Sequence, residues 1–237
     1  MTTTPHTRTA EHDLSQAKEH PNPAVGGTPF PGEEMPLRNT GVASLGHRAP
    51  VLAIAGGTAS GKSTLAKALT LHRPTAVALI HLDDFYVPAH DPHHGVRTLS
   101  ATGAETLDWN HPGSIDEDAA AAALEAAATS GQHRIVVVEG LFALTLPKIA
   151  AQATWRIYVH APDDIRLARK LMRKIETQRQ DPLVSLRNYL LSGRDRHAQH
   201  VAPSRHRADL VLDGTTPTTD LLTAVDHLVG ANPAPTP

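Results

Sequence analysis

One segment constrains the fold of this chain more than any other feature. The residues GGTASGKST, 56–64, fit the pattern G-x-x-x-x-G-K-[ST] in every position. They lie between a short apolar run, 51–55, and a segment of helical character that begins at Lys62. In such a loop the glycines let backbone N–H groups point inward at phosphate oxygens, and the following helix presents its positive end. The segment therefore predicts a strand, a phosphate-binding loop and a helix in immediate succession.

This loop implies binding of a nucleoside triphosphate. Lys62 is expected to reach the β- and γ-phosphates, and the Ser63 hydroxyl is expected to coordinate Mg²⁺. A phosphate-binding loop does not identify the group that receives the phosphate. The residues assigned to nucleotide binding in the loop are Gly56, Gly57, Thr58, Ala59, Ser60, Gly61, Lys62, Ser63 and Thr64.

Strands and helices are predicted to alternate along the rest of the chain. The fold class that this order predicts is α/β, a P-loop NTPase three-layer α/β/α sandwich with a five-stranded, mostly parallel sheet and a basic helical lid. An S-I-D-E capping-box pattern at 114–117 predicts the start of an Ala-rich helix that ends near Thr129. Pro162 is expected at the first position of another helix, with two Asp residues in its first turn. Strands are expected at 51–55, 76–81, 135–138, 155–160 and 210–212, and further helices at 62–71, 183–200 and 219–229.

Composition divides the chain and narrows its class. Residues 1–48 and 231–237 lack a sustained apolar period and are expected to be disordered, which leaves one ordered domain at 49–230. The absence of Cys excludes disulfides and thiol nucleophiles. A net charge of −2 argues against a nucleic-acid-coating protein. No long apolar run or signal segment is found, so the chain is expected to be cytoplasmic, with neither nucleic acid nor membrane as partner.

Carboxylates follow two of the predicted strands. Asp83 and Asp84 come after 76–81, and Glu139 comes after 135–138. Ligands of open parallel sheets bind beyond the carboxyl ends of the strands. We therefore expect Asp83 to accept the proton of an attacking hydroxyl or to help hold Mg²⁺. Asp84 is assigned to the turn, and the alternative that both Asp residues merely end the strand stays open. Ser63, Asp83 and Glu139 form the candidate Mg²⁺ ligand set.

The helix that begins at Pro162 is predicted to carry one basic face. Its basic residues recur at offsets of 3, 4, 7 and 8 from the first of them. We interpret the face as a lid that closes over a triphosphate, and the alternative is an ordinary solvated helix face. The basic residues are Arg166, Arg169, Lys170, Arg173 and Lys174.

Taken together, these residues resemble the uridine kinase and phosphoribulokinase family of P-loop kinases. The resemblance spans about 51–213 and rests on five segments besides the phosphate loop. Each is similar to a family motif, and the five occur in the family's order. They are DDFY at 83–86, WNHPGSID at 109–116, IVVVEG at 135–140, DIRLARKLMR at 164–173 and APSRHRAD at 202–209.

The resemblance implies transfer of phosphate from ATP, with Mg²⁺, to the 5′-hydroxyl of a nucleoside. The partner it implies is therefore a small nucleoside-type molecule, and a homo-oligomer is possible. Position by position, it implies Asp83 as the base, with Lys62 and Arg173 also catalytic. Arg169 is then assigned to ATP, and the residues assigned to the substrate are Tyr86, Asn110, His111 and Lys170.

The chain also departs from the family pattern. Asn110 stands where the family has an Asp, and Asp108 is the nearest replacement. The segment GQHR at 131–134 runs straight into a strand where pyrimidine kinases carry a base-reading hairpin. The lid's later E-R-G-R pattern appears as TQRQ at 177–180, and Lys174 replaces an Asp. These departures bear on the pyrimidine acceptor more than on kinase activity.

Several alternatives therefore accompany the uridine kinase-like interpretation. Nicotinamide riboside kinases resemble the chain through DDFY and through a D-W-D-x-P segment similar to 108–112. A regulatory P-loop NTPase and a non-catalytic binding protein are alternatives of another class, although no guanine-reading N-K-x-D occurs. Metal binding at His93 and His94, or at His197 and His200, is disfavoured. Residues 87–107 are expected to be a flexible loop on the substrate side, where Arg97 or His94 touches the substrate.

Overall fold

The computed structural model describes residues 48–72, 76–91, 93–177 and 181–231. Both segments expected to be disordered lie outside these residues, apart from Arg48 and Ala231. Arg48 donates a 2.8 Å hydrogen bond to Glu125, and Ala231 is the last residue of a helix. The division into a domain at 49–230 and two flanking segments stays a prediction.

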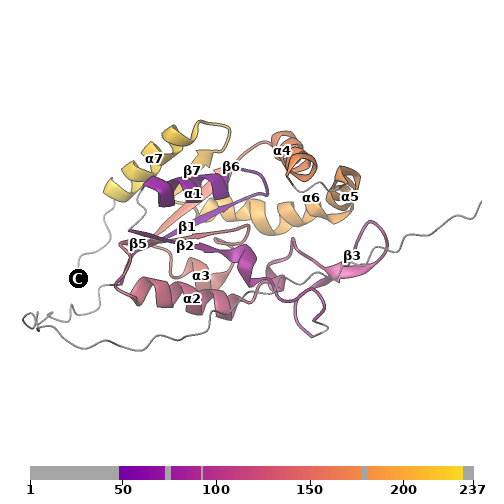
Figure 1. Cartoon of the computed structure of the whole chain (residues 1–237), viewed down its shortest axis with the longest axis horizontal. Coiled ribbons are helices and arrows are strands. Elements are labelled where there is room, and N and C mark those ends of the chain that lie inside the picture. Colours follow the sequence, from indigo (N-terminus) through magenta and orange to yellow (C-terminus); the bar gives the residue numbers. More distant parts are fainter. Residues whose placement is uncertain (1–47, 73–75, 92, 178–180, 232–237) are drawn as a thin grey trace, which may run out of the picture. The chain divides into compact units, whose positions relative to one another are not determined.

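A five-stranded parallel sheet forms the centre of the fold, as expected. The strands follow the order β2-β5-β1-β6-β7, and every neighbouring pair is parallel (Figure 1). All five were predicted to within a residue or two of their bounds. These bounds are β1 Val51–Gly56, β2 Val77–His81, β5 Ile135–Glu139, β6 Trp155–His160 and β7 Leu210–Asp213.

Helices cover both faces of the sheet. Figure 1 shows α1 and α7 on one side and α2 and α3 on the other. No helix among the described residues combines the length and apolarity needed to span a bilayer. The bounds are α1 Lys62–His72, α2 Glu117–Thr129, α3 Pro147–Ala150, α4 Asp163–Glu176, α5 Pro182–Asn188, α6 Arg194–Arg196 and α7 Thr218–Ala231.

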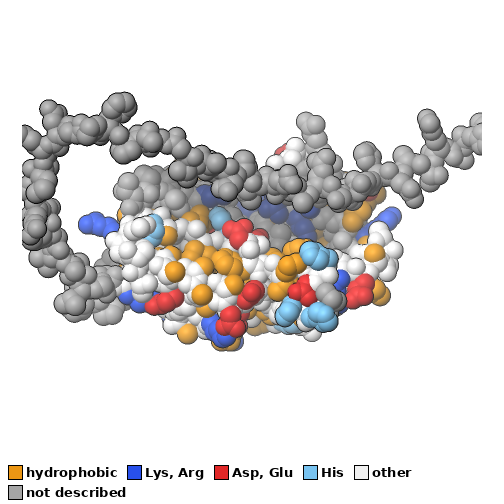
Figure 2. Space-filling model, turned by 60° about the horizontal axis from the view of Figure 1, so that its bottom comes forward, with side chains coloured by type: hydrophobic (Ala, Val, Ile, Leu, Met, Phe, Trp, Pro, Cys, Tyr) orange, Lys and Arg blue, Asp and Glu red, His pale blue; other side chains and the backbone are white. Residues whose placement is uncertain are grey.

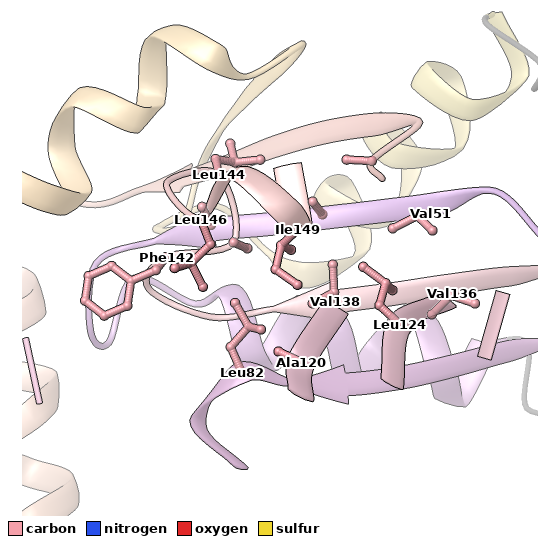
Figure 3. Packing of buried hydrophobic residues seen from close by; sticks show 14 of the residues in the cluster. Val51, Leu82, Ala120, Leu124, Val136, Val138, Phe142, Leu144, Leu146 and Ile149 are labelled. Carbon is pink, nitrogen blue, oxygen red and sulfur yellow. The ribbon is translucent and has the colours of Figure 1, made fainter. Parts of the chain in front are cut away.

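Successive side chains of β1 point to opposite faces of the sheet, which explains why a layer of helices packs on each face. Val51, Ala53 and Ala55 pack into one buried cluster with Leu124 of α2, shown in Figure 3. Leu52 and Ile54 point to the other face and pack with helices α1 and α7. A strand with apolar residues at every position is buried on both faces, which a parallel sheet requires.

The starts of two helices differ from the prediction. The N-cap of α2 is Asp116, whose carboxylate accepts from Ala119 N at 2.9 Å. Ser114 instead lies buried in the 3₁₀ turn Pro112–Ser114 and accepts from Val96 N at 3.2 Å. The capping-box prediction was therefore wrong, because Ser114 is used for a tertiary contact. Pro162 is the cap before α4 rather than its first residue, although both Asp residues do lie in the first turn.

The helix predicted at 183–200 is confirmed as one helical segment from Pro182 to Val201, but only part of it has α-helical hydrogen bonding. After α5 the chain forms wider, π-type turns at Tyr189–Gly193, then α6, and π-type turns again at His197–Val201. A 3₁₀ turn, Ala202–Arg207, then leads toward β7.

Residues 87–107 were expected to be a flexible loop; the structure contradicts the absence of regular structure there, and the flexibility stays a prediction. These residues contain a hairpin of β3 Arg97–Leu99 and β4 Glu105–Leu107. The Arg97 guanidinium donates to the Ala89 carbonyl at 2.7 Å. At the other end, Ala101 N donates to Asn188 Oδ1 of α5 at 2.8 Å. One contact within the segment and one with a residue 87 positions farther along the chain thus hold a segment whose polar composition resembles that of a loop.

Candidate active site

A cavity of about 1190 Å³ opens at the carboxyl ends of the strands. It is lined by the phosphate loop, by α4 and α5, by the segment around Trp109 and by the start of α7. In an open parallel sheet this edge is the expected position of a ligand. The described residues therefore place the phosphate loop and the predicted acceptor side on one cavity.

The phosphate loop adopts the conformation that its glycines allow. Gly56 and Gly61 have φ of 149° and 108°, and Ala59 lies in the left-handed region at 61°. Ser60 N donates to the Gly57 carbonyl at 3.1 Å, which closes the turn. The loop residues that line the cavity are Thr58, Ala59, Gly61, Lys62, Ser63 and Thr64, while Gly56, Gly57 and Ser60 are buried beneath them.

Lys62 and Glu139 lie next to each other at this edge. The Lys62 ammonium is 3.7 Å from Glu139 Oε2, and both side chains are buried. Glu139 Oε1 is 2.8 Å from His81 Nδ1. Glu139 is not among the residues that line the main cavity, whereas Lys62 beside it is.

Asp83 faces the cavity from the short 3₁₀ turn Leu82–Phe85 that follows β2. Asp83 remains exposed to solvent, but the partial loss of water around its carboxyl raises the pKa of that group, and the nearby Lys62 opposes the shift. Glu139 adds to the rise through like-charge repulsion. A carboxylate with a raised pKa holds a proton more strongly, which suits a general base.

The oxygen donors at this edge fit Mg²⁺. This cation is held by one or two protein carboxylates together with phosphate and water oxygens. Ser63 and Asp83 line the cavity, and Glu139 Oε2 is a buried oxygen without a hydrogen-bond partner among the described residues. These three residues would hold the ion, and its assignment stays a proposal.

Two aromatic side chains form part of the wall on the acceptor side. The Tyr86 hydroxyl donates to the Trp109 carbonyl at 2.6 Å, and the two rings meet edge to face at 5.0 Å and 63°. Burial raises the pKa of the Tyr86 phenol, so it remains a donor at neutral pH. Trp109 is 46% exposed, and both residues line the cavity together with Asn110.

Asp108 and His111 do not face this cavity. Asp108 is 1% exposed and accepts from Arg196 Nε at 2.8 Å and from Asn110 N at 3.0 Å. It therefore cannot stand in for the family's Asp at position 110. His111 accepts from Gly113 N at 3.0 Å, and its ring packs against His200 at 4.5 Å. Of the four predicted substrate residues, the structure brings Tyr86, Asn110 and Lys170 to the cavity but not His111.

The basic face of α4 is divided between the cavity and the phosphate loop. Arg169, Lys170, Arg173 and Lys174 line the cavity. Arg169 Nη1 also donates to the Gly214 carbonyl at 3.0 Å, which ties α4 to the turn after β7. Burial and the neighbouring cations Lys174 and Arg173 lower the pKa of Lys170. Neighbouring cations repel one another, and a bound polyanion such as a triphosphate would relieve that repulsion.

Arg166 has a different position from the rest of that face. It is buried and donates to Asp163 at 2.6 Å. Its guanidinium packs against the backbone of Gly57, behind the phosphate loop. The predicted lid is therefore attached to the loop through its first turns.

Sequence reasoning missed the turn after β7 and the helix α5 as parts of the site. Gly214 packs so closely on the loop that a Cβ there would overlap the Ser60 carbonyl oxygen. The signal that would have found this turn is D-G-T-T, at the end of the last parallel strand. The cavity-lining residues in these two segments are Gly214, Thr215, Thr216, Pro217 and Thr218 in the turn, and Val184, Ser185 and Asn188 in α5.

The histidine pairs form no metal site within the described part of the chain. Histidine side chains gather beside acidic ones on the face shown in Figure 2. However, no three His, Cys, Asp or Glu side chains among the described residues converge as metal ligands would. Asp91 accepts instead from His93 N and from His94 Nδ1, both at 2.8 Å.

Comparisons with known proteins agree with the resemblance inferred from the motifs. The model of the Phosphoribulokinase / Uridine kinase family matches residues 114–221. A uridine kinase of Chloroflexus aurantiacus is 24% identical over 188 residues, which cover 69% of this chain and 86% of that protein. A uridine kinase of Clostridium perfringens is 26% identical over 184 residues, which cover 68% of this chain and 85% of that protein. The predicted resemblance to this kinase family is therefore confirmed.

Two solved structures that match part of this chain are the following. A possible uridine kinase from Bacillus stearothermophilus has a TM-score of 0.44 at 15% identity, over 70% of this chain and 89% of that one. The shikimate kinase of Acinetobacter baumannii has a TM-score of 0.47 at 14% identity, over 80% and 97%.

Proposed function

We propose that this chain, a P-loop kinase related to the phosphoribulokinase and uridine kinase family, transfers the γ-phosphoryl group of ATP to a hydroxyl of a nucleoside. The observation that carries the proposal is the shared cavity. The phosphate loop and Asp83 line it together with the aromatic pair Tyr86 and Trp109. A donor and an acceptor bound there lie on either side of Asp83.

The residues divide the reaction between them. The loop N–H groups and Lys62 hold the triphosphate. The oxygen of the acceptor hydroxyl bonds to the γ-phosphorus, and Asp83 takes the proton of that hydroxyl. At the same time the bond between the γ-phosphorus and the β–γ bridging oxygen breaks, and ADP leaves. Lys170 and Arg173 offset negative charge on the transferred group. Mg²⁺, when bound with ATP, neutralises charge on the β- and γ-phosphates.

The aromatic wall supports an acceptor with a planar ring. Trp109 presents an exposed ring at the cavity, and such a surface stacks on any nucleobase. Asn110 offers a neutral amide where the family has a carboxylate, so a ribose hydroxyl there meets a weaker acceptor. We expect the 5′-hydroxyl to be the one that reaches Asp83.

A nicotinamide riboside acceptor is the second candidate. The segment between α2 and β5 is short, and Arg134 N already bonds to the Ala76 carbonyl at 2.8 Å. No hairpin lies there to read a pyrimidine, within the described residues. This favours an acceptor whose base is recognised less specifically than uridine.

A screen for acceptor-dependent ADP formation tests the proposal. The acceptors are uridine, cytidine, nicotinamide riboside, other nucleosides, pantothenate and simple sugars, with Lys62→Ala as the inactive control. We expect turnover with at least one nucleoside and a 5′-monophosphate product by mass spectrometry. Turnover with sugars or pantothenate alone would reject the nucleoside. No turnover with any acceptor would favour a regulatory NTPase.

A further inference from the structure

Glu139 and His81 occupy paired positions at the carboxyl edge of the sheet. They are register partners on the parallel strands β5 and β2, so their side chains leave the sheet on the same face. The distance from His81 Nδ1 to Glu139 Oε1 is 2.8 Å. An ionised carboxylate only accepts, so His81 must carry its proton on Nδ1. The imidazole therefore fixes the rotation of the carboxylate.

The second oxygen of Glu139 is left without a donor. Oε2 is buried and has no hydrogen-bond partner among the described residues, and the nearest cation is Lys62 at 3.7 Å. A buried carboxylate oxygen without a partner is costly, and an ion or a water is the usual explanation. The oxygen that His81 leaves uncommitted is thus the one on the side of the phosphate loop.

We propose that His81 is a positioning residue that orients Glu139, so that Oε2 is held toward the Mg²⁺ that accompanies ATP. Glu139 then contacts the ion or one of its waters, and His81 acts only through Glu139. The arrangement resembles the carboxylate–histidine pairs that orient metal ligands, with the roles reversed. The inference rests on the proposed function only in requiring ATP as the phosphate donor.

Binding of ATP without any acceptor tests this inference. Titration calorimetry would measure the affinity for ATP with excess Mg²⁺ and again with EDTA. For His81→Ala we expect affinity with Mg²⁺ to fall about ten- to a hundredfold, as for other residues that orient metal ligands. Affinity in EDTA should remain at the wild-type value. His160→Ala is the matched control, since His160 ends strand β6, which β1 separates from β5, and it does not line the cavity.

Two conservative variants separate positioning from packing. In His81→Asn the side-chain amide nitrogen occupies the place of Nδ1, one bond from Cγ, so the variant should recover most of the Mg²⁺-dependent affinity. In His81→Gln the amide lies one carbon farther out, and we expect little recovery. Both side chains are polar and of similar size, so the pair remains informative if His81→Ala fails to fold.

Three results with the variants would overturn the inference, and so would one result with the wild-type protein. The three are wild-type affinity for Mg²⁺–ATP in His81→Ala, an equal loss with and without Mg²⁺, and equal behaviour of the Asn and Gln variants. A wild-type protein whose ATP affinity does not depend on Mg²⁺ would overturn it as well. Because no acceptor is present, failure of the nucleoside screen leaves this measurement intact, so the two proposals fail separately.

Discussion

The backbone of Gly57 packs directly against the guanidinium of Arg166: a Cβ built on Gly57 would lie 2.5 Å from Nη1. Arg166 is itself buried and held by Asp163. The phosphate loop and the basic helix α4 are therefore parts of one packed unit. The close approach of Arg166 requires glycine at position 57, independently of any hydrogen bond from the Gly57 N–H to phosphate.

Gly57→Ala should destabilise this unit. Overpacking a tight contact costs about 1–3 kcal/mol, and we expect a loss of that size in the free energy of unfolding, measured with urea. In an Arg166→Ala background the same substitution should cost less, because the clashing group is gone. Gly230→Ala is the control, since a Cβ there meets nothing within 4 Å. Equal costs in both backgrounds would show that the clash is not with Arg166.

Asp83→Asn should remove phosphoryl transfer and spare ATP binding. General-base catalysis contributes about 10²–10⁴-fold, and we expect kcat to fall by at least that factor while the affinity for ATP changes little. The measurement is steady-state kinetics together with calorimetry. Asp84→Asn is the matched control, because Asp84 is the adjacent carboxylate and does not line the cavity. Near-normal turnover of Asp83→Asn would show that Asp83 is not the base.

Lys62→Ala should affect the donor side instead. The ammonium lies between the loop and Glu139, and its loss removes the charge that faces the β- and γ-phosphates. We expect phosphoryl transfer to be abolished and ATP affinity to fall, in contrast to Asp83→Asn. Titration of ATP into both variants under identical conditions distinguishes them, and equal ATP affinities would contradict the division of roles.

The ion pair between Asp108 and Arg196 should be important for stability. Asp108 is 1% exposed, so Arg196→Met leaves a buried carboxylate without its cation. Removing one partner of a buried pair costs about 3–5 kcal/mol, and we expect urea unfolding to show a loss near the lower figure. The double variant with Asp108→Asn should recover part of it.

Arg194→Met is the comparison for that measurement. Its guanidinium is 3.8 Å from Asp195 and both side chains are well exposed, so the change should cost no more than about 1 kcal/mol. A similar loss in the two Arg variants would show that burial of Asp108 is not the cause.

His197 should make stability depend on pH. Burial and the nearby Arg166 lower the pKa of His197 to about 4, against about 6.5 in an unfolded chain. Between these pH values the unfolded state binds more protons than the folded state. The contribution of His197 to stability is therefore complete above about pH 6.5 and is lost as the pH falls toward 4. Unfolding at pH 7 and pH 5 measures the loss, which should be smaller in His197→Gln. An equal loss in the variant would assign the effect to other groups.

The local sequence pattern was enough to predict the sheet, the phosphate loop and the carboxylate Asp83. Apolar runs such as 135–138 lie in strands, and the spacing of GGTASGKST required a phosphate loop between β1 and α1. Lys62, Ser63 and Asp83 line the cavity because the topology of a parallel sheet brings strand ends to one edge. For these residues, sequence neighbours determine the position.

Prediction failed where contacts distant in sequence decide the structure. Ser114 resembles a helix cap, but its hydroxyl bonds Val96 N, so Asp116 takes its place. The hairpin at 97–107 has a loop-like composition, and its turn is held by Asn188, 87 residues farther along the chain. His111 belongs to a segment similar to a family motif and was therefore assigned to the substrate, but its ring packs against His200.

The sequence by itself determined the α/β class, the phosphate loop and the carboxylates that follow the strands, because each depends on the order of residues within one or two elements. Only the tertiary structure decided which side chains share the cavity. It placed Arg166 behind Gly57, tied Asp108 to Arg196 and paired His81 with Glu139. These relationships join segments 58 to 109 residues apart, and packing between layers, rather than any local preference, selects them.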